Sequence, residues 1–416
     1  MVGQRGGGPL GAVPAVAPPR FLFYSHDGVG LGHVRRNLCV ASALAELIPE
    51  VSILVVTSTE EADLFGIPPG VDLLKLPGLR KVAKGHYVAR RLPMRWEELR
   101  SMRTHLFTAA VESFRPHVLL VDKHPFGIGE ELGPALEAAR DAGAQAILGL
   151  RDVLDDPVVV RAEWDEHHLL ERIPDYYDRI LVYGQPELLD LPRVYDFPDS
   201  VRALTRFCGY VVSSGRDGGW EDVLPNLQSR RPLVLGTAGG GEDGFALLST
   251  FMEAAAGAHW QGVVVSGPQS PPARARALER LADEAGVMFR RFVPNISSAF
   301  SSLDALVSMG GYNTLAEAAS SAIPTVCVPR VRPRREQLIR ARAFAHRGLL
   351  RLVEPELLDA ETLRVEIEAA IAGEAHPNGR NEVLDLGGAR RAALHLRELA
   401  AAGRRAHTPG DAAAAG

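Results

Sequence analysis

The stretch FLFYSHDGVGLGHVRRN, Phe21–Asn37, joins an apolar run to a glycine-rich turn and then to an amphipathic segment. Phe21–Tyr24 has the composition of a buried strand. The residues 35–48 repeat apolar side chains near the helical period. A strand, a glycine turn and a helix in this order are typical of the first unit of a parallel α/β sheet.

The same alternation continues along the chain. In the first half, further strands are expected at 51–57, 117–121, 146–150 and 179–183, with a helix at 132–142. A second series predicts strands at 232–236, 262–266, 287–289, 305–308 and 325–328, and helices at 244–256, 274–285 and 315–321. The sequence therefore predicts an α/β fold of two Rossmann-like, doubly wound domains that face a central cleft, where ligands bind at the strand ends.

Composition suggests the domain boundaries. We expect a disordered N-terminus at 1–19, a first domain at 20–212, a linker at 213–230, a second domain at 231–375, C-terminal helices at 376–403 and a disordered tail at 404–416. No apolar run reaches the roughly 20 residues of a membrane span. The net charge of −5 argues against nucleic acid. Three widely spaced cysteines suit a reducing cytoplasm and form no disulfide framework or zinc site.

The first glycine-rich turn contains Gly30 and Gly32 and is followed by His33. An NAD fingerprint would have a glycine at the position of His33 and an acid after the second strand, which instead ends in Thr57-Ser58-Thr59. A dinucleotide site is therefore disfavoured. One interpretation places His33 in the cleft as a base or substrate ligand, and the other makes it a surface histidine on a tight turn.

Two further glycine motifs follow strands of the second half. Gly239, Gly240 and Gly241 expose amide N–H groups that suit phosphate oxygens, although a hinge loop would have the same composition. The stretch SMGGYNTLAE, Ser308–Glu317, predicts a strand, a Gly-Gly turn and a helix capped by Asn313 or Thr314. We place Glu317 in the first turn of that helix, where it could accept two ribose hydroxyls or act as a capping-box partner.

The segment 308–348 resembles the donor-binding half of bacterial two-Rossmann (GT-B) glycosyltransferases with a glycosyltransferase family 28 C-terminal domain. That group includes the transferase that adds N-acetylglucosamine to the lipid-linked peptidoglycan precursor. The opening stretch, VDKHPFG and LRDVLDDP are similar to bacterial proteins described only as glycosyltransferases of this type. The resemblance covers about residues 20–375. It implies inverting, metal-independent transfer of a sugar from a nucleotide-diphosphate donor, expected to be a UDP-sugar, to an acceptor hydroxyl, with no tightly bound cofactor.

The resemblance also implies residue roles. Glu317 would hold the donor ribose, and Glu336 and Gln337 would contact the donor sugar, with Glu-Gln where the peptidoglycan enzyme has Gln-Gln. Independently of the resemblance, the basic run 330–347 flanks this motif, and we favour neutralisation of the diphosphate by Arg330 or Arg332 over a purely solvated face. The full donor set is Gly239, Gly240, Gly241, Gly310, Gly311, Asn313, Thr314, Glu317, Arg330, Glu336 and Gln337.

His33 and Asp152 are the candidate bases, because each follows a strand that points to the cleft. Gly30, Gly32, Asp122, Lys123 and His124 are the candidate acceptor-side residues. The acids at 152, 155 and 156 could pair on a divalent ion, but we favour capping acids in a loop and expect no metal site.

The segment Lys75–Arg103 has nine Lys or Arg and two Glu, with Tyr87 and Trp96 interleaved. It is either a solvated face or a patch for an anionic acceptor group or membrane surface, which would place the protein peripherally at the inner membrane face. The acceptor class stays open between a glycan, a lipid-linked sugar and a small molecule. The alternatives to transfer are a sugar-nucleotide epimerase or hydrolase on the same fold, and a non-catalytic nucleotide-sugar-binding protein.

Overall fold

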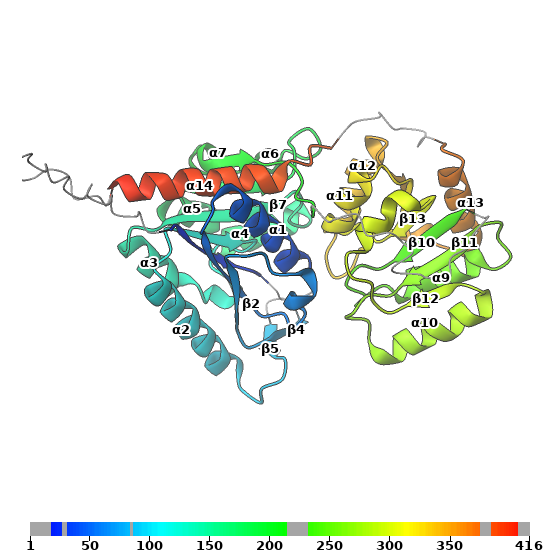
Figure 1. Cartoon of the computed structure of the whole chain (residues 1–416), viewed down its shortest axis with the longest axis horizontal. Helices are drawn as coiled ribbons and strands as arrows, with labels where there is room; N and C mark the ends of the chain where they lie inside the picture. Colours follow the sequence, from blue (N-terminus) through cyan, green and yellow to red (C-terminus); the bar gives the residue numbers. More distant parts are fainter. Residues whose placement is uncertain (1–17, 27–30, 84–85, 214–231, 375–383, 407–416) are drawn as a thin grey trace, which may run out of the picture.

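The computed structural model describes residues 18–26, 31–83, 86–213, 232–374 and 384–406. Gly30, almost all of the expected linker and most of both expected disordered termini lie outside the described residues. Two parallel α/β sheets build the described part, as the sequence predicts, and they form two lobes that lie side by side (Figure 1).

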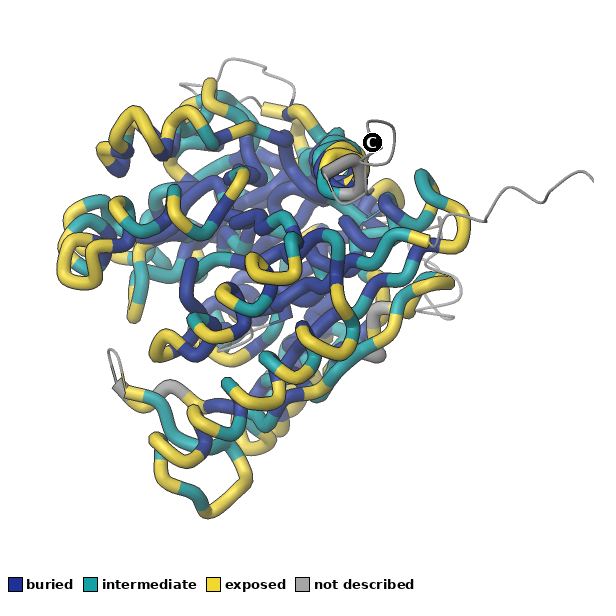
Figure 2. Tube along the Cα trace, turned by 90° about the vertical axis from the view of Figure 1, so that its left-hand side faces the viewer, coloured by how far each residue is buried: buried dark blue, intermediate teal, exposed yellow. Residues whose placement is uncertain are grey.

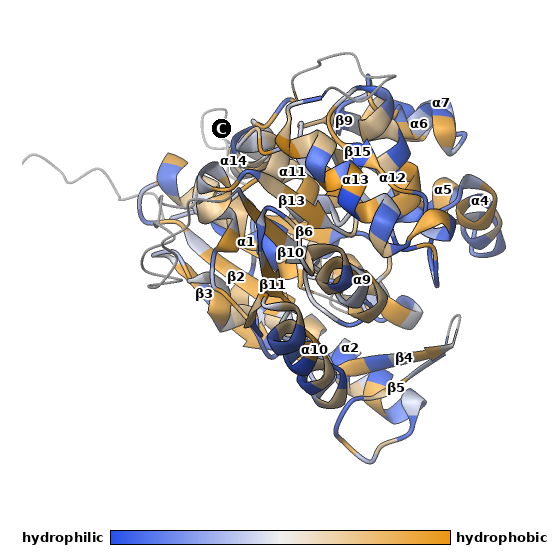
Figure 3. Cartoon of the chain, turned by 90° about the vertical axis from the view of Figure 1, so that its right-hand side faces the viewer, coloured by the Kyte–Doolittle hydropathy of each residue, from blue (hydrophilic) through white to orange (hydrophobic). Residues whose placement is uncertain are grey.

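The N-terminal lobe has a seven-stranded parallel sheet in the order β3-β2-β1-β6-β7-β8-β9. Its strands are β1 (Arg20–Tyr24), β2 (Ser52–Thr57), β3 (Val71–Lys75), β6 (Val118–Asp122), β7 (Gln145–Arg151), β8 (Arg179–Tyr183) and β9 (Thr205–Phe207). Its α-helices are α1 (Gly32–Leu47), α2 (Trp96–Phe114), α3 (Gly133–Asp141), α4 (Pro157–Glu166), α5 (Leu169–Tyr176), α6 (Leu191–Val194) and α7 (Asp199–Leu204). Two 3-10 turns are η1 (Ala62–Phe65) and η2 (Ile128–Glu130). A hairpin, β4 (Leu79–Ala83) with β5 (His86–Ala89), projects beside the sheet (Figure 3).

The C-terminal lobe has a six-stranded parallel sheet in the order β12-β11-β10-β13-β14-β15. Its strands are β10 (Leu233–Thr237), β11 (Gln261–Val265), β12 (Met288–Arg290), β13 (Ala305–Ser308), β14 (Thr325–Cys327) and β15 (Arg351–Leu352). Its helices are α9 (Phe245–Ala255), α10 (Pro272–Ala285), α11 (Tyr312–Ser320), α12 (Glu336–His346) and α13 (Ala360–Ile371), with 3-10 turns η3 (Ile296–Ser302) and η4 (Pro355–Leu357). The strands are apolar and α10 is largely hydrophilic in Figure 3.

The last helix, α14 (Gly388–Ala406), returns to the N-terminal lobe and lies along it (Figure 1). Its Leu396 and Ala392 are fully buried in the same core as Val34 and Leu44 of α1. Each buried aliphatic side chain of this kind contributes about 1.5–3 kcal/mol. In Figure 2 the buried residues gather in the interior beneath exposed outer segments.

The two lobes share an apolar contact. Tyr210, after β9, stacks on Tyr312 of α11 with ring centroids 5.5 Å apart. The Tyr312 hydroxyl accepts a hydrogen bond from the Val211 amide at 2.9 Å. Phe344 of α12 meets Tyr210 edge to face at 5.6 Å. This contact fixes which strand ends of the two sheets face one another.

Strand order reverses at the β1/β6 neighbours in one sheet and at the β10/β13 neighbours in the other. Ligands of doubly wound sheets bind outside the carboxyl ends of strands at such reversals. The motifs around His33, Gly239 and Gly310 all follow strands at these two points.

Candidate active site

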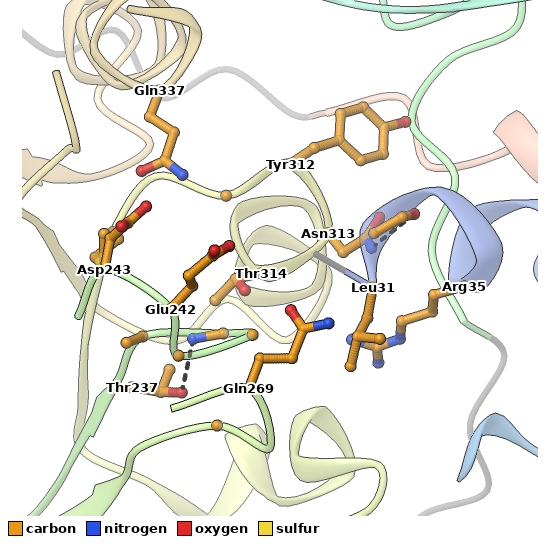
Figure 4. Close-up of a pocket in the computed structure, with 18 of the residues that line it drawn as sticks. Leu31, Arg35, Thr237, Glu242, Asp243, Gln269, Tyr312, Asn313, Thr314 and Gln337 are labelled. Carbon is orange, nitrogen blue, oxygen red and sulfur yellow. Dashed lines mark hydrogen bonds between the residues drawn. The ribbon is translucent and has the colours of Figure 1, made fainter. Parts of the chain in front are cut away.

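A cavity of about 320 Å³ lies between the lobes at these strand ends. Both lobes contribute to its wall (Figure 4), where Leu31 and Arg35 at the start of α1 lie across from Thr237 and Gln269. The predicted residues that line it are Gly32, His33, Lys123, Gly239, Gly240, Gly241, Gly311, Asn313, Thr314, Glu317, Arg330, Glu336 and Gln337. The wall does not include Asp122, His124, Asp152 or Gly310.

His33 forms a buried pair with Asp122. Its Nδ1 lies 2.5 Å from Asp122 Oδ2, and the other carboxylate oxygen accepts a hydrogen bond from Arg36 Nη2. Arg36 follows His33 by three residues on α1, so both reach the end of β6 from one helix face. Because the ionised carboxylate can only accept a hydrogen bond, the Nδ1 contact places the proton on Nδ1 and leaves Nε2 as the unprotonated nitrogen of a side chain that lines the cavity.

The charges of this pair follow from burial. Burial lowers the pKa of His33 to about 3, although Asp122 opposes the shift. Burial alone would raise the pKa of Asp122, but Arg36 and His33 outweigh it and hold that pKa well below the ordinary value. At neutral pH the site therefore contains a carboxylate, a neutral imidazole and a guanidinium, which is the arrangement of an oriented general base.

Two more histidines adjoin this pair. The His26 ring lies 6.0 Å from the His33 ring and 6.3 Å from the His124 ring. Burial lowers the pKa of His124 to about 4 and that of His26 well below its ordinary value, so both are neutral at pH 7. Asp122 ends β6 and Lys123 and His124 follow it; of these three predicted acceptor-side residues, Lys123 alone lines the cavity.

The loop after β10 brings the glycines against the opposite wall. Gly241 has φ 94°, and a Cβ there would lie 2.2 Å from the Ser266 carbonyl oxygen, so only glycine fits without displacement. The Thr237 hydroxyl accepts a hydrogen bond from the Gly239 amide at 3.3 Å (Figure 4). The loop therefore holds a compact turn of backbone at the cavity wall.

The stretch Ser308–Glu317 contains the N-terminus of α11. The helix begins at Tyr312 after Gly311, and no side chain caps it, so Asn313 and Thr314 are not the caps that the sequence suggests. Asn313 instead donates to the Gly32 carbonyl oxygen at 3.3 Å and thereby joins the lobes. The first-turn amides of α11 lack partners within the helix and carry partial positive charge, which favours an anion.

Glu317 is the sixth residue of α11 and lies in its second turn, not the first, so it is not a capping-box partner. Its Oε1 lies 2.6 Å from Arg35 Nη2 of the other lobe. Burial raises the pKa of Glu317, and Arg35 opposes that shift. The residue predicted to bind ribose therefore lines the cavity and is paired across it.

Arg330, Glu336 and Gln337 form one cluster. Arg330 contacts Asp243 at 2.7 Å and Glu336 Oε1 at 2.8 Å, while its amide donates to Gln337 Oε1 at 3.1 Å. Glu336 Oε2 is buried without a hydrogen-bond partner among the described residues. Burial would raise the pKa of Glu336, but Arg151 and Arg330 outweigh it and lower that pKa.

The comparisons with known proteins agree with this geometry. Residues 240–384, which contain the second glycine loop, α11 and the Arg330 cluster, match the glycosyltransferase family 28 C-terminal domain. The chain has a GT-B fold with a glycosyltransferase family 28 C-terminal domain.

Solved structures similar to this GT-B chain share its fold at low identity. MurG of Acinetobacter baumannii has a TM-score of 0.54 at 17% identity, covering 92% of this chain and 100% of that one. A UGT transferase of Siraitia grosvenorii in complex with UDP has a TM-score of 0.58 at 14% identity, and the match covers 94% of this chain and 96% of that one. A Listeria monocytogenes protein assigned as a UDP-N-acetylglucosamine 2-epimerase has a TM-score of 0.60 at 14% identity, and the match covers 94% of this chain and 98% of that one. No curated protein matched the chain.

Asp152, the second candidate base, lies outside the cavity wall of the GT-B site. Its carboxylate pairs with Arg340 of α12 through contacts of 2.8 and 2.7 Å, and it accepts a hydrogen bond from the Tyr210 hydroxyl at 3.0 Å. Asp152 is only 2% exposed. These contacts make it a link between the two lobes and leave it no path to an acceptor hydroxyl.

The acids that follow Asp152 are also engaged. Asp155 accepts a hydrogen bond from the Arg335 amide at 2.8 Å, and Asp156 caps α4 by accepting from the Val158 amide. Over the described ranges, no group of three or more His, Cys, Asp or Glu side chains could hold a metal ion.

The basic segment Lys75–Arg103 contains the β4–β5 hairpin and the start of α2. Arg103 is buried, and its Nε donates a hydrogen bond to Glu131 Oε2 at 2.7 Å, so it is not part of a surface patch. Val82 and Leu92 are exposed. Within the part of the chain that the structure describes, no helix has the length and apolar character to cross a membrane.

Sequence reasoning missed Arg35, Arg36, Arg151 and Arg340, and gave Asp122 only an acceptor-side role. The three-residue spacing of His33 and Arg36 could have indicated a shared helix face. The pairings of His33 with Asp122 and of Asp152 with Arg340 span 89 and 188 residues, so no local pattern indicates them.

Proposed function

We propose that this GT-B protein transfers a sugar from a nucleotide-diphosphate donor, a UDP-sugar, to an acceptor hydroxyl with inversion at the anomeric carbon. The observation that carries the proposal is the His33–Asp122 pair, whose histidine lines the same cavity as the glycine loop and the N-terminus of α11. An in-line displacement requires a base and a set of anion-binding amides in one cavity.

In the proposed step, His33 Nε2 removes the acceptor hydroxyl proton while the oxygen attacks the anomeric carbon. The bond from that carbon to the diphosphate oxygen breaks, and the nucleoside diphosphate leaves with the electron pair. Asp122 stabilises the imidazolium that forms, since its carboxylate already contacts Nδ1. The amides at Gly239–Gly241 and at the start of α11, together with Arg330, stabilise the leaving group.

Glu317 would bind the donor ribose in this proposal. Its carboxylate now pairs with Arg35, and a ribose diol would share or replace that contact. UDP as the donor nucleotide is supported by the Siraitia grosvenorii structure, which holds UDP on the same fold. The hexose, the acceptor, the cytoplasmic location and a membrane contact through the segment Lys75–Arg103 remain predictions.

A thermal-shift panel tests the donor site, using UDP-, dTDP-, GDP- and ADP-sugars and NAD on the wild type and on Glu317→Ala. A ligand at 100 times its dissociation constant adds about 2.7 kcal/mol to the free energy of unfolding. We expect one nucleotide sugar to shift the wild type and not Glu317→Ala. Glu354→Ala is the matched control, because it breaks a Glu–Arg pair with Arg342 on the outer surface.

The ligand-induced shift of each variant is compared with its own apo form, which cancels any change in folding stability. The proposal would be refuted if NAD alone shifted the melting temperature, or if none of the nucleotide sugars did. Product analysis without an acceptor separates the alternatives: rapid release of free sugar indicates a hydrolase, an altered sugar an epimerase, and binding without turnover a non-catalytic protein. A transferase needs an added acceptor, and its turnover should fall about 10²- to 10⁴-fold in His33→Ala with donor binding retained.

A further inference from the structure

Three cations line the cavity next to His33, from three different segments. Lys123 follows β6, Arg151 ends β7 and Arg334 precedes α12. The strands β6 and β7 are neighbours paired at Asp122 and Gly149, and the Lys123 amide donates to the Gly149 carbonyl oxygen at 2.7 Å. Tertiary structure thus brings the three charges, all half-buried, to the lining of one cavity.

The carboxylates of this wall do not balance these charges. Within the described ranges, Arg151 Nε is buried without a hydrogen-bond partner. Arg334 Nε lies 3.8 Å from Asp155 Oδ2, a long ion pair. Among the acids, Glu336 does most to raise the pKa of Arg151. However, Glu336 Oε1 already accepts a hydrogen bond from Arg330.

The cations also destabilise one another. Burial lowers the pKa of Lys123 well below its ordinary value, and Arg334 and Arg151 act in the same direction. Burial lowers the pKa of Arg151 to about 10, with Arg340 adding to the shift and Glu336 opposing it. Glu336 compensates only part of this charge, and holding the three groups together is unfavourable for folding alone.

The backbone at Lys123 is strained as well. Its φ is 72°, a left-handed conformation that costs a non-glycine residue about 1–2 kcal/mol. A glycine at this position would relieve the strain but would remove the ammonium group from the cavity. Strain of this kind is typical of functional sites, where the surrounding structure holds a side chain in place.

We propose that Lys123, Arg151 and Arg334 bind a carboxylate or phosphate group carried by the substrate beside the hydroxyl that His33 deprotonates. This inference rests on the proposed function and adds a substrate class to it, an anionic sugar or an anionic acceptor. We assign the donor diphosphate to the amides of the glycine loop and α11 and to Arg330, which shares the segment after β14 with Arg334. Lys123 and Arg151 come from the other lobe, on the side of the base.

The test compares glucose with glucose 6-phosphate and glucuronate, each titrated calorimetrically into the protein in saturating UDP. We expect the two anionic probes to bind at least tenfold more tightly than glucose. Lys123→Met and Arg151→Gln should each remove most of that preference and leave the dissociation constant of UDP within twofold. Lys123→Arg should retain the preference, and Arg172→Gln, which breaks a surface pair with Glu130, should not affect it.

A second arm identifies the source of the anion. UDP-glucuronate is compared with UDP-glucose on the same variants. A charge preference here, lost in Lys123→Met, would place the group on the donor sugar, whereas a preference confined to the free probes would place it on the acceptor. Both outcomes support the site.

Three outcomes would overturn it. In the first, the anionic and neutral probes bind equally or not at all. In the second, the variants leave the preference for anionic probes intact. In the third, the variants weaken the binding of UDP as much as that of the probes, which would assign the cluster to the diphosphate. Failure of UDP itself to bind would count against the proposed function. The probe preference measured without UDP would still report on the cluster, so the two failures are distinguishable.

Discussion

Replacing Asp122 by asparagine tests the centre of the candidate site, because it keeps the shape of the side chain and removes its charge. Asp122 and Arg36 are each 1% exposed at the side chain, and no other carboxylate pairs with Arg36 among the described residues. The variant therefore leaves a buried guanidinium without a counter-charge. Removing one partner of a buried ion pair costs about 3–5 kcal/mol.

The structure places Asp122→Asn near the lower end of that range. Its amide oxygen can still accept one hydrogen bond, from Arg36 or from His33, and its similar volume leaves no cavity. We expect the free energy of unfolding to fall by about 3 kcal/mol. The amide also offers His33 no charged acceptor at Nδ1, so the tautomer with a free Nε2 loses its preference and turnover should fall about 10²- to 10⁴-fold.

The measurements are urea denaturation followed by tryptophan fluorescence, and nucleoside diphosphate release with donor and acceptor. A second variant separates the two effects. In Asp122→Leu combined with Arg36→Met, the buried charges are both gone, so stability should recover most of the loss while turnover stays low.

The reasoning would be refuted by an Asp122→Asn protein that unfolds within about 1 kcal/mol of the wild type and keeps turnover within threefold. Such a result would mean that water solvates Arg36 and that His33 does not depend on the carboxylate. Recovery of both stability and turnover in the double variant would also contradict the assignment of His33.

Three further predictions concern other parts of the molecule. Asp152→Asn should lower the free energy of unfolding by about 3–5 kcal/mol through its buried pair with Arg340, and should leave the pH–rate profile unchanged, as urea denaturation and kinetics would show. Gly241→Ala should weaken donor binding at least tenfold in calorimetry, because its Cβ would meet a carbonyl oxygen, whereas Gly257→Ala, also at positive φ but with nothing within 4 Å, should cost only about 1 kcal/mol of stability. The free energy of unfolding should fall as pH drops below about 6.5, because three histidines bind protons there in the unfolded state and stay neutral in the folded state. Each histidine contributes a slope of at most about 1.4 kcal/mol per pH unit, down to its own folded pKa. A urea midpoint that stays constant from about pH 7 to about pH 4.5 would count against this prediction. The histidines are His26, His33 and His124.

The sequence determined the parts of this protein that depend on local chemistry. Apolar runs alternating with amphipathic segments predicted two parallel sheets, and the structure confirms both. Glycines directly after strands marked the loops at the cleft, because only residues tolerant of positive φ make such turns. The strand β3 and the β4–β5 hairpin escaped prediction, since their residues are mostly half-buried or exposed and form no continuous apolar run.

Only the tertiary structure decided which charged groups meet. Asp122 and Asp152 both stand at strand ends, and the sequence favours Asp152 as a candidate base and gives Asp122 an acceptor-side role. The order of the sheet places Asp122 behind His33, and the packing of the lobes places Asp152 against Arg340, so one acid pairs with a histidine that lines the cavity and the other links the two lobes. The same packing collects Lys123, Arg151 and Arg334 on one wall. A Coulomb interaction depends on distance in space and on burial, and neither follows from separation along the chain.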